Sequence, residues 1–473
     1  MGINLIAAVI LNKGKLCIGA GNDLLCKIPD DLKNFKMITE TYTVVMGRKT
    51  WDSLKHKPLK NRTNIVLTRN GPPDEYYNDT HFMTFNQFKS SKPLYTGDKY
   101  FVIGGGEIYN LFMKDTELYP TKLYLTHIKC KLGDKVPDTW LGDDFLHKYV
   151  LNKHSDEMLY GDVKYRYLFY DYTTVRHQEN QYLQLIENIL ENGNERSDRT
   201  GTGTVSLFGT HMKFDISKSI PVMTTRSSPF RVILEELLFF CRGDTDAKIL
   251  QNKNVKIWDG NTSREFLDKR GLNHYDEGIM GPIYGYQWRH FGADYGQKYA
   301  DSSKADMSEV GGFDQLKHVE YLLKNDPYSR RIVISAWEPS KTDQMVLAPC
   351  HILLQFYVEE IKGQKYLSCQ FYQRSSDQLA FCFNVVSYSI LTHILALRCG
   401  MKPKNIIYIA GDCHVYKNHI DAVKPQLDRN IRPFPTMNIK NIVATVDWED
   451  ISVDDFELIG YFPHPAIKMP MCV

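Results

Sequence analysis

The sequence is short of glycine, proline and unbalanced charge, and each shortage excludes a class of protein. With 31 glycines and 20 prolines in 473 residues, the chain has too few of either for a fibrous or disordered protein. Its 58 Lys and Arg residues nearly balance 56 Asp and Glu residues, leaving a net charge of +2. A near-neutral chain is a weak candidate for binding nucleic acid or an anionic membrane. Any phosphate group that it binds must therefore be met by local arginines.

Paired cysteines and long apolar runs are also lacking. The ten cysteines include no Cys-x-x-Cys pair, so the sequence predicts neither a zinc site nor a thioredoxin-type motif, and we expect no bound metal. Scattered cysteines in a long chain favour reduced thiols and a cytoplasmic location. No apolar run approaches the roughly 18 residues that cross a bilayer. The apolar segment Met1–Ile10 lacks a basic start and a cleavage site, and it is better explained as a buried strand than as a signal peptide.

The first third of the chain alternates strand and helix patterns, which predicts an α/β domain with a mostly parallel central sheet flanked by helices. The last expected strand is rich in aromatics and is expected to close one edge antiparallel. Strands are expected at Asn4–Leu11, Thr43–Met46, Asn64–Thr68, Tyr100–Ile103, Lys122–Ile128 and Lys164–Asp171, and helices at Asp30–Thr39, Lys49–Leu54 and Glu107–Lys114.

A short polar break divides the chain. We therefore expect a first domain over residues 1–172, a junction at 173–177 and a second domain over 178–473. Segment Ala300–Gly312 is polar and is expected to be a surface loop. In the second domain, helices are expected at His177–Asn192, Val232–Cys241 and Val385–Leu397, and strands at Ile332–Trp337, Ile352–Val358 and Leu367–Tyr372.

Several strands of the first domain run into a glycine-rich or charged turn, where ligands bind in open α/β sheets. Segment Phe101–Tyr109 places three glycines between a strand and a helix, so a ligand could approach the backbone there; a tight turn explains the segment equally well. Arg48 and Lys49 follow one strand, and Arg69 follows another. Singly these would be surface charges, but together they favour a clamp for the extra phosphate of NADP.

A carboxylate opens the first expected helix. Pro29 suits the first turn, and Asp31, Leu32 and Phe35 share one face of the helix. A partly desolvated carboxylate beside an apolar face could grip the amidine-like edge of a ring. The alternative is that the aspartates there only favour the helix dipole.

Taken in order, these segments resemble dihydrofolate reductase. The match runs through Asn4–Ala8, Ile18-Gly19, Asp31, Met46–Arg48, Ile103–Gly106 and Leu123–His127, and covers residues 1 to about 172. The resemblance implies hydride transfer from NADPH to dihydrofolate, with Asp31 as the pterin-binding carboxylate that promotes protonation. It implies a folate pocket formed by Ile6, Ala8, Asp31, Phe35, Arg62 and Thr126, with Thr126 tied to Asp31. It implies an NADPH site formed by Ala8, Ile18, Gly19, Gly47, Arg48, Lys49, Thr50, Thr68, Arg69, Gly104, Gly105, Gly106, Glu107 and Tyr109.

Two positions depart from this family. Leu25-Cys26 stands where the family usually has Pro-Trp, so the indole N–H that would orient a water near the pterin is missing. Because sulfur is a weak donor, we expect altered folate or inhibitor affinity but retained chemistry. Glu107 follows the glycines, and its charge opposes a phosphate there.

In the second domain, Cys350 leads into an expected strand. A cysteine is a useful nucleophile only when cations stabilise its thiolate, and a lone cysteine is more often a small buried residue. His351 cannot form a Cys/His pair with it, because adjacent strand residues point to opposite faces. Several arginines at the ends of elements suggest a phosphate cage that would also lower the pKa of the thiol. In the apolar run Val232–Cys241, Glu235-Glu236 is either salt-bridged or a proton relay.

These residues resemble thymidylate synthase, from about residue 178 to Val473. The match runs through Arg199–Gly203, Ile257–Asp259, Gly281–Gly285, Ser329–Ile332, Ala348–His351, Gln373–Ser375, Phe383-Asn384, His414–Tyr416 and Gly460–Pro465. The resemblance implies an α+β domain that methylates dUMP with methylenetetrahydrofolate and releases dihydrofolate.

The resemblance also implies roles. Cys350 would attack carbon 6 of the uracil, Glu236 would move protons through water, and Tyr284 would help to remove the proton from carbon 5. The dUMP site would comprise Arg199, Arg330, Arg331, Arg374, Ser375, Asp377, Asn384, His414 and Tyr416. Arg330 and Arg331 would come from the partner subunit of a homodimer. Trp258 and Asp377 would contact folate, although segment Asp377–Asn384 is one residue shorter than in the family and lacks its glycine and proline.

The main hypothesis is therefore one enzyme with two active sites, in an order that resembles the bifunctional proteins of protists and plants, supplying dTMP for DNA synthesis. Its partners would be dUMP, folates and a second copy of the chain, with no membrane and no nucleic acid. Two alternatives stay open. One is a thiol hydrolase with a cofactor domain, which the adjacent Cys350 and His351 disfavour. The other is a binding module in which one domain is inactive and serves as a dimer scaffold or a nucleic-acid regulator.

Overall fold

The computed structural model describes residues 2–69, 77–91, 99–198, 201–296 and 311–468. The chain forms two compact units. Unit 1 comprises Met1–His177 with two later segments, Arg429–Phe434 and Gly460–Pro465. Unit 2 comprises Gln178–Asp428, Pro435–Ile459 and Ala466–Val473. The first break, between residues 177 and 178, falls at the expected junction, but the two later segments pack with unit 1 although they lie far along the chain.

The later segments of unit 1 are held by a buried arginine. Arg432 is 3% exposed, and its Nη1 donates to the carbonyl oxygens of Phe462 at 3.0 Å and Gly14 at 2.9 Å. A β-carbon at Gly14 would lie 2.5 Å from the ring of Pro465. The two late segments are thereby joined to the turn after the first strand of unit 1.

The sheet of unit 1 is mostly parallel, as predicted. Its strands are ordered β10-β12-β8-β1-β7-β4-β5-β6, and β1, β4, β5, β6, β7 and β8 pair in parallel. Strand β12 pairs antiparallel with β8, but β10 covers its other side, so the expectation that β12 forms the edge was wrong. The strands of unit 1 are β1 (Gly2–Asn12), β2 (Lys15–Ala20), β3 (Asp23–Leu24), β4 (Thr43–Gly47), β5 (Thr63–Leu67), β6 (Thr80–Met83), β7 (Lys99–Gly104), β8 (Lys122–Lys129), β9 (Thr139–Trp140), β10 (Tyr149–His154), β11 (Met158–Tyr160) and β12 (Val163–Tyr172).

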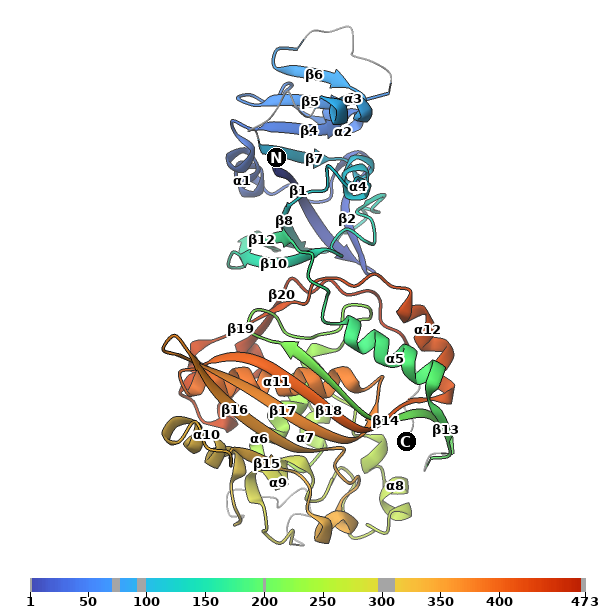
Figure 1. The fold of residues 1–473 in the computed structure, drawn as a ribbon, viewed down its shortest axis with the longest axis vertical. Helices are drawn as coiled ribbons and strands as arrows, with labels where there is room; N and C mark the ends of the chain where they lie inside the picture. Colours follow the sequence, from blue (N-terminus) through green and yellow to red (C-terminus); the bar gives the residue numbers. More distant parts are fainter. Residues whose placement is uncertain (1, 70–76, 92–98, 199–200, 297–310, 469–473) are drawn as a thin grey trace. The chain divides into compact units, whose positions relative to one another are not determined.

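The helices of unit 1 follow the expected strand–turn–helix plan (Figure 1). They are α1 (Pro29–Thr39), α2 (Arg48–Ser53), α3 (Phe85–Ser90) and α4 (Gly106–Lys114). Pro29 lies in the first turn of α1, where its missing N–H costs nothing, and two aspartates in that turn suit the positive end of the helix dipole. Because α2 and α4 begin directly after β4 and β7, both turns lie at the same edge of the sheet.

Two clusters form the core around the site of unit 1. They enclose β1, whose near-continuous apolar run is typical of a central parallel strand. The first contains Ile6, Val44, Met46, Trp51, Val66 and Phe101. The second contains Ile10, Cys17, Leu25, Ile28, Ile128 and Tyr165.

Unit 2 is an α+β unit with a mostly antiparallel sheet, in the order β13-β14-β18-β17-β16-β15. Only the pair β17–β18 runs parallel in this sheet. Strands β14 and β18 were not predicted, because Gly209 and Gly411 interrupt their apolar patterns. The strands of this sheet are β13 (Asn194–Arg196), β14 (Thr204–Asp215), β15 (Val333–Ser335), β16 (His351–Ile361), β17 (Gln364–Asp377) and β18 (Lys402–Tyr416). Unit 2 also has a separate pair, β19 (Thr436–Ile439) and β20 (Phe456–Ile459).

The three helices predicted in unit 2 are present as α5, α6 and α11. Gly243 ends α6 in the left-handed conformation that favours glycine. The helices are α5 (Asn180–Asn192), α6 (Phe230–Arg242), α7 (Lys248–Gln251), α8 (Arg264–Lys269), α9 (Tyr284–His290), α10 (Gln315–Asn325), α11 (Phe381–Arg398) and α12 (Ile420–Leu427). Short 3₁₀ helices lie at Gly260–Thr262, Pro339–Gln344, Lys417–His419, Asn441–Ala444, Trp448–Asp450 and Val453–Asp455.

Helix α11 packs on β17 and β18 and forms the centre of unit 2 (Figure 1). By length and composition it could cross a membrane, and it is the one such helix among the described residues. Most of its side chains are buried inside unit 2, as in the core helix of a globular domain. The expected surface loop at Ala300–Gly312 lies mostly outside the described residues.

Candidate functional sites

The expected carboxylate of unit 1 is in contact with its expected partner. Asp31 lies in the first turn of α1, and its Oδ1 accepts a hydrogen bond of 2.6 Å from the Thr126 hydroxyl on β8. Thr126 lies opposite Ala8 of β1 in the parallel register. Burial raises the pKa of the Asp31 carboxyl, and the hydrogen bond from Thr126 lowers it. The site therefore holds an acid that keeps its proton to a higher pH than an exposed aspartate.

The apolar wall and the cation of the predicted folate pocket are also placed together. Phe35 packs against the cluster that contains Ile6. The Arg62 guanidinium lies 5.8 Å from the centre of the Phe35 ring, and its Nη1 donates to Thr39 Oγ1 at 2.8 Å. Burial lowers the pKa of Arg62. Together, Asp31 and the Phe35 ring could bind a flat ligand, and the Arg62 cation could bind a carboxylate at its far end.

The glycine turns of the predicted NADPH site form a close-fitting backbone cradle. Met46 pairs with Gly104, so the turns that follow β4 and β7 lie side by side. A β-carbon added at Gly104 or at Gly105 would meet the Thr50 hydroxyl at 3.4 or 3.3 Å, and Gly104 has a φ of +128°. Only glycine leaves this backbone open to a ligand. Gly47 is needed for a different reason, since a β-carbon there would lie 2.8 Å from Ile108 of α4.

Strand β2 brings a further part of the predicted cofactor site to this cradle. A β-carbon at Gly106 would lie 2.9 Å from Thr139 and 3.8 Å from Ile18 Cδ1. Thr139 in turn pairs with Gly19. Tyr109 has a structural contact: its hydroxyl is buried and donates to the carbonyl oxygen of Ile6 at 2.7 Å.

The predicted phosphate-binding cations are available at the surface but already have acidic neighbours. Arg48 Nε lies 3.1 Å from Asp52 Oδ1, one turn further along α2. Arg69 and Glu107, both highly exposed, approach to 4.0 Å. Exposed pairs of this kind contribute little and separate easily. The remaining predicted residues Lys49 and Thr68 lie beside them, the first exposed and the second half-buried.

Sequence analysis missed two tyrosines near Asp31. Tyr167 of β12 lies directly opposite Thr126, and its hydroxyl donates to the carbonyl oxygen of Asp30 at 3.4 Å. Burial, followed by the charge of Asp31, raises the pKa of Tyr167 to about 12. Burial and the nearby aspartates also raise the pKa of Tyr165. The alternating aromatics of this strand were the available signal, because every second residue shares a face with Thr126.

In unit 2, Cys350 lies just before β16 in a segment held by an arginine. The backbone N–H of Cys350 donates to the Tyr284 hydroxyl oxygen at 2.8 Å. Arg374 donates from its backbone N to the Cys350 carbonyl oxygen at 2.8 Å, and from Nε to the Pro349 carbonyl oxygen, also at 2.8 Å. Its guanidinium lies 5.3 Å from the centre of the Trp337 ring. Strand β17 continues to Asp377, so Arg374 and Ser375 lie on the strand and do not follow it as expected.

The His351 ring contacts two tyrosines. It stacks on Tyr284 with centroids 4.1 Å apart, and its Nδ1 bonds to the Tyr388 hydroxyl. Burial lowers the pKa of His351 to about 3, so the ring stays neutral.

The two adjacent glutamates of α6 lie in different surroundings. Glu235 is salt-bridged, with an oxygen 2.8 Å from Lys253 Nζ. Glu236 accepts a hydrogen bond of 2.9 Å from the Trp258 indole N–H. Burial raises the pKa of Glu236 to about 7, against a smaller lowering by Trp258, although part of the side chain keeps contact with solvent. Burial is the main cause that raises the pKa of Tyr284, and the charges of Cys350 and Glu236 add to it. Tyr284 and Glu236 are therefore close enough to interact electrostatically.

Strands β17 and β18 place several more of the predicted dUMP residues side by side. Ser375 pairs with Asp412, and Asp377 pairs with His414. His414 is 7% exposed and its Nδ1 lies 2.9 Å from Asp412 Oδ1. Burial raises the pKa of Asp377, and the charge of His414 opposes that shift. Asn384 of α11 and Tyr416 of β18 complete this group; Asn384 donates to Gln373 Oε1 at 2.9 Å, and the Tyr416 ring lies 5.2 Å from His414.

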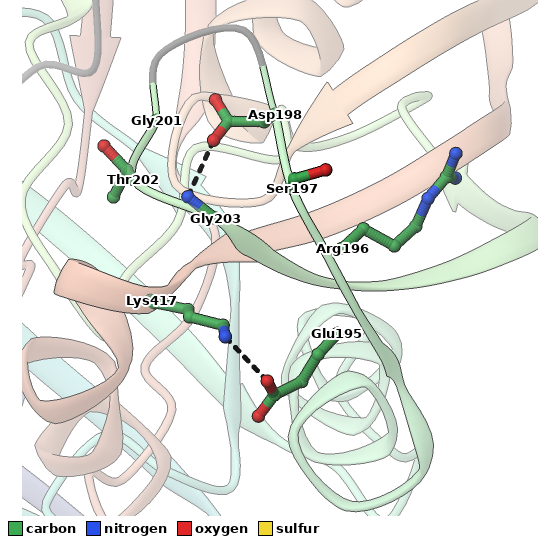
Figure 2. Close-up of a pocket in the computed structure, with 8 residues that line it drawn as sticks. All are labelled: Glu195, Arg196, Ser197, Asp198, Gly201, Thr202, Gly203 and Lys417. Carbon is green, nitrogen blue, oxygen red and sulfur yellow. Dashed lines mark hydrogen bonds and ion pairs between the residues drawn. The ribbon is translucent and has the colours of Figure 1, made fainter.

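A pocket at the start of β14 contains the glycine–threonine loop (Figure 2). The Asp198 carboxylate accepts from the Gly203 N–H at 2.7 Å and fixes the loop. Lys417 Nζ lies 2.6 Å from Glu195 Oε2 on the same wall. Arg199 itself lies outside the described residues, and Lys417 was not predicted. The pocket is lined by Glu195, Arg196, Ser197, Asp198, Gly201, Thr202, Gly203 and Lys417.

Two predicted arginines are not brought to this site by the single chain. Arg330 and Arg331 lie just before β15 and are exposed. The backbone N of Arg331 donates to Ser329 Oγ at 3.4 Å. The surface position of both leaves them available to a second molecule.

Fold and sites together define a two-domain enzyme of nucleotide and folate chemistry. The dihydrofolate reductase family model matches residues 2–173, and the thymidylate synthase family model matches residues 180–473. The chain belongs to the bifunctional dihydrofolate reductase–thymidylate synthase family, and it carries both enzyme activities in dTMP synthesis.

Relatives of that description are similar over nearly their whole length. One from Paramecium tetraurelia is 38% identical over 481 residues, covering 99% of this chain and 98% of the relative. One from Zea mays is 38% identical over 520 residues, with 98% and 96% covered. One from Leishmania major is 37% identical over 501 residues, with 96% and 93% covered. The two families imply NADPH, methylenetetrahydrofolate and dUMP as small-molecule ligands.

Proposed function

We propose that Asp31 is the pterin-binding carboxylate that promotes protonation in the reductase site, and that Cys350 is the nucleophile of the synthase site, assisted by Glu236. The observation that most strongly supports the roles of the two carboxyl groups is the environment of Asp31 and Glu236. Each is a desolvated carboxyl group with one side-chain donor, from Thr126 and Trp258 respectively. A raised pKa suits an acid that must hold a proton at neutral pH and release it to substrate.

In the reductase site, Asp31 binds the polar edge of the pterin, and Ile6, Ala8 and Phe35 cover its face. Arg62 holds the glutamyl carboxylate of the folate.

NADPH supplies the hydride when it is bound. The glycines at 47 and 104–106, with Thr50 and Tyr109, present the backbone along which this ligand lies, and Ile18 and Gly19 close the other side. A β-carbon at Gly104 or Gly105 would lie only 3.4 or 3.3 Å from the Thr50 hydroxyl, which fits such close approach. Arg48, Lys49, Thr68 and Arg69 meet the phosphates, with Glu107 as an opposing charge.

In the synthase site, the Cys350 thiolate forms a bond to carbon 6 of dUMP, and the electron pair of the ring double bond moves to carbon 5. Carbon 5 then attacks the methylene of the folate. Once the carbon 5 proton is lost, tetrahydrofolate is eliminated from the methylene and transfers a hydride to it, which gives the methyl group and dihydrofolate. The electron pair of the exocyclic double bond restores the double bond between carbons 5 and 6 and expels the Cys350 thiolate. Tyr284 assists the loss of the carbon 5 proton, and Glu236 returns protons through water. Asn384 binds the uracil edge, which disfavours cytosine because its donors and acceptors would be left unpaired. His414 and Tyr416 bind the deoxyribose, and Trp258 and Asp377 contact the folate.

The phosphate of dUMP is held by Arg199, Arg374 and Ser375, completed by Arg330 and Arg331 of a second subunit. The exposure of Arg330 and Arg331 supports this homodimer, since exposed guanidinium groups can reach a neighbouring phosphate. The enzyme works on small molecules in the cytoplasm, where scattered thiols are reduced under ordinary conditions.

Fluoro-dUMP tests the synthase assignment directly. Incubation with fluoro-dUMP and methylenetetrahydrofolate should give a covalent adduct at Cys350, identified by peptide mass spectrometry. Cys399→Ser, a change at another partly buried thiol, is the matched control and should keep the adduct. An adduct on any other cysteine, or none, would refute the assignment.

A further inference from the structure

Two cysteines that the proposed function does not use lie together beside the Asp31 site of unit 1. Cys26 lies between β3 and α1, and Cys130 directly follows β8. Both are free, partly buried thiols. Both pack against the same core cluster, which contains Leu25, Ile28 and Ile128. Leu25, next to Cys26, and Ile128, two residues before Cys130, are buried members of this cluster. Both thiols pack against it from the outside.

Their shared cluster brings the two thiols close enough to affect each other. Burial is the largest cause that raises the pKa of Cys130, and Cys26 raises it further. A cation lies next to the pair, because Lys135 Nζ donates to the carbonyl oxygens of Leu24 at 3.3 Å and Leu25 at 2.9 Å. Lys135 lowers the pKa of Cys130, although this is the smallest of the causes. A nearby ammonium group favours the thiolate, which is the reactive form.

The position of the pair connects it to the acid of the reductase site. The loop with Cys26 leads into the first turn of α1, which carries Asp31. Strand β8 carries Thr126 and ends just before Cys130. A covalent bond between the cysteines would join the same two elements that the 2.6 Å hydrogen bond from Thr126 to Asp31 joins.

We propose that Cys26 and Cys130 are a redox modification site: they form a reversible disulfide that slows dihydrofolate reduction. Formation of the bond is independent of the proposed function of unit 1, whereas its effect on rate rests on that function. The physical reason for the effect is distance. A disulfide is about 2.05 Å long and holds the two Cα atoms about 4.4–6.8 Å apart, so it would fix the spacing between the loop before α1 and the end of β8. A displacement of about 1 Å at a reacting group can cost up to about 10²-fold in rate.

The oxidant is a low-molecular-weight disulfide such as oxidised glutathione. One cysteine thiolate attacks a sulfur of this disulfide and releases one glutathione thiolate, leaving a mixed disulfide. The second cysteine thiolate attacks the protein sulfur of that mixed disulfide and releases the second glutathione. Two electrons pass from the cysteine pair to glutathione, and the protons of the two thiols end on the two released thiols.

Peptide mapping tests the bond without any measurement of activity. The full chain is equilibrated with reduced and oxidised glutathione at several ratios, its free thiols are blocked, and the digest is analysed by mass spectrometry. We expect a linked peptide containing Cys26 and Cys130 that disappears on reduction. Cys130→Ser should abolish it and Cys399→Ser should keep it. Glutathione adducts on the separate cysteines, or a bond from either of them to Cys17, would overturn the proposal.

The reductase rate tests the effect. NADPH oxidation with dihydrofolate is followed for the oxidised and the dithiothreitol-treated chain. We expect kcat/KM for dihydrofolate to be at least about fivefold lower in the oxidised chain, to recover with dithiothreitol, and to be insensitive to glutathione in Cys130→Ser. Equal rates despite a linked peptide would overturn the proposal. Absence of the reaction in the fully reduced chain would instead refute the proposed function of unit 1.

Discussion

Asp31 in unit 1 and Glu236 in unit 2 are chemically similar acids in structurally different places. Asp31 lies in the exposed first turn of a helix, where a single strand residue, Thr126, reaches its carboxylate. Glu236 lies within an apolar helix, and an indole N–H from a loop reaches it. In both, burial is the main cause of the raised pKa, and one hydrogen bond opposes it. In two unrelated folds, burial that outweighs one hydrogen bond from a neutral donor thus gives a carboxyl group with a raised pKa.

We expect the two sites to act independently, and the strongest test of this is to remove Cys350, the proposed nucleophile of unit 2. Cys350→Ser should lower the synthase kcat by about 10⁴-fold or more, because an alcohol is a far poorer nucleophile than a thiolate. Reductase kcat/KM should stay within about twofold of the original chain, within the scatter of such comparisons. Spectroscopic assays of dihydrofolate formation and of NADPH oxidation measure the two separately. Loss of both activities would show that the sites are coupled.

The reciprocal change removes the acid of unit 1. Asp31→Asn should lower reductase kcat/KM at pH 7 by about 10²–10⁴-fold, the usual contribution of a general acid. Because the pKa of Asp31 is raised, the original activity should fall as the pH rises through that pKa, and the variant should lose this limb. Thr126→Val provides a graded control, since it removes only the donor to Asp31. A variant with an unchanged pH profile would contradict the role of Asp31.

The same two acids show how far sequence reasoning can reach. Asp31 was found from a local pattern, a proline and an aspartate opening an amphipathic helix, and the resemblance then supplied its partner. The local pattern alone did not distinguish Glu235 from Glu236, because adjacent helix residues differ only in what packs around them, and the resemblance supplied the choice of Glu236. The contacts that distinguish their surroundings, with Lys253 and Trp258, come from a later segment. The later segments of unit 1 were missed for a similar reason, because their contacts with unit 1 are long-range and no local periodicity indicates them.

The burial of Glu236 predicts a pH-dependent stability that sharpens the comparison. Its pKa is raised from 4.5 to about 7 in the folded chain, so the folded state binds more protons than the unfolded state between those values. Stability contributed by this group is therefore fully present below about pH 4.5 and is lost as the pH rises to about 7, to a total of about 3 kcal/mol. Glu236→Gln should remove that part of the dependence.

Urea unfolding of unit 2 at several pH values, read at a tryptophan signal, measures this effect. Glu235→Gln is the matched control on the same helix, and it should destabilise unit 2 without flattening the pH dependence, because it leaves the ammonium group of Lys253 without its partner. An equal slope in the original chain and in Glu236→Gln would show that this carboxyl is not desolvated.

The smallest expected effect concerns the tyrosine that sequence analysis missed. Tyr167→Phe removes the 3.4 Å hydrogen bond to the Asp30 carbonyl oxygen and leaves the ring in place. A bond of this kind contributes about 0.5–1.5 kcal/mol, so reductase kcat/KM should fall by about two- to tenfold through looser placement of the first turn of α1. Tyr165→Phe is the control on the same face of β12, and its ring lies 5.9 Å from that of Tyr167. An equal loss in both variants would mean that only strand packing is disturbed. A selective loss in Tyr167→Phe would show that Asp31, unlike Glu236, depends on a second contact that holds its helix as well as on the donor that touches its carboxylate.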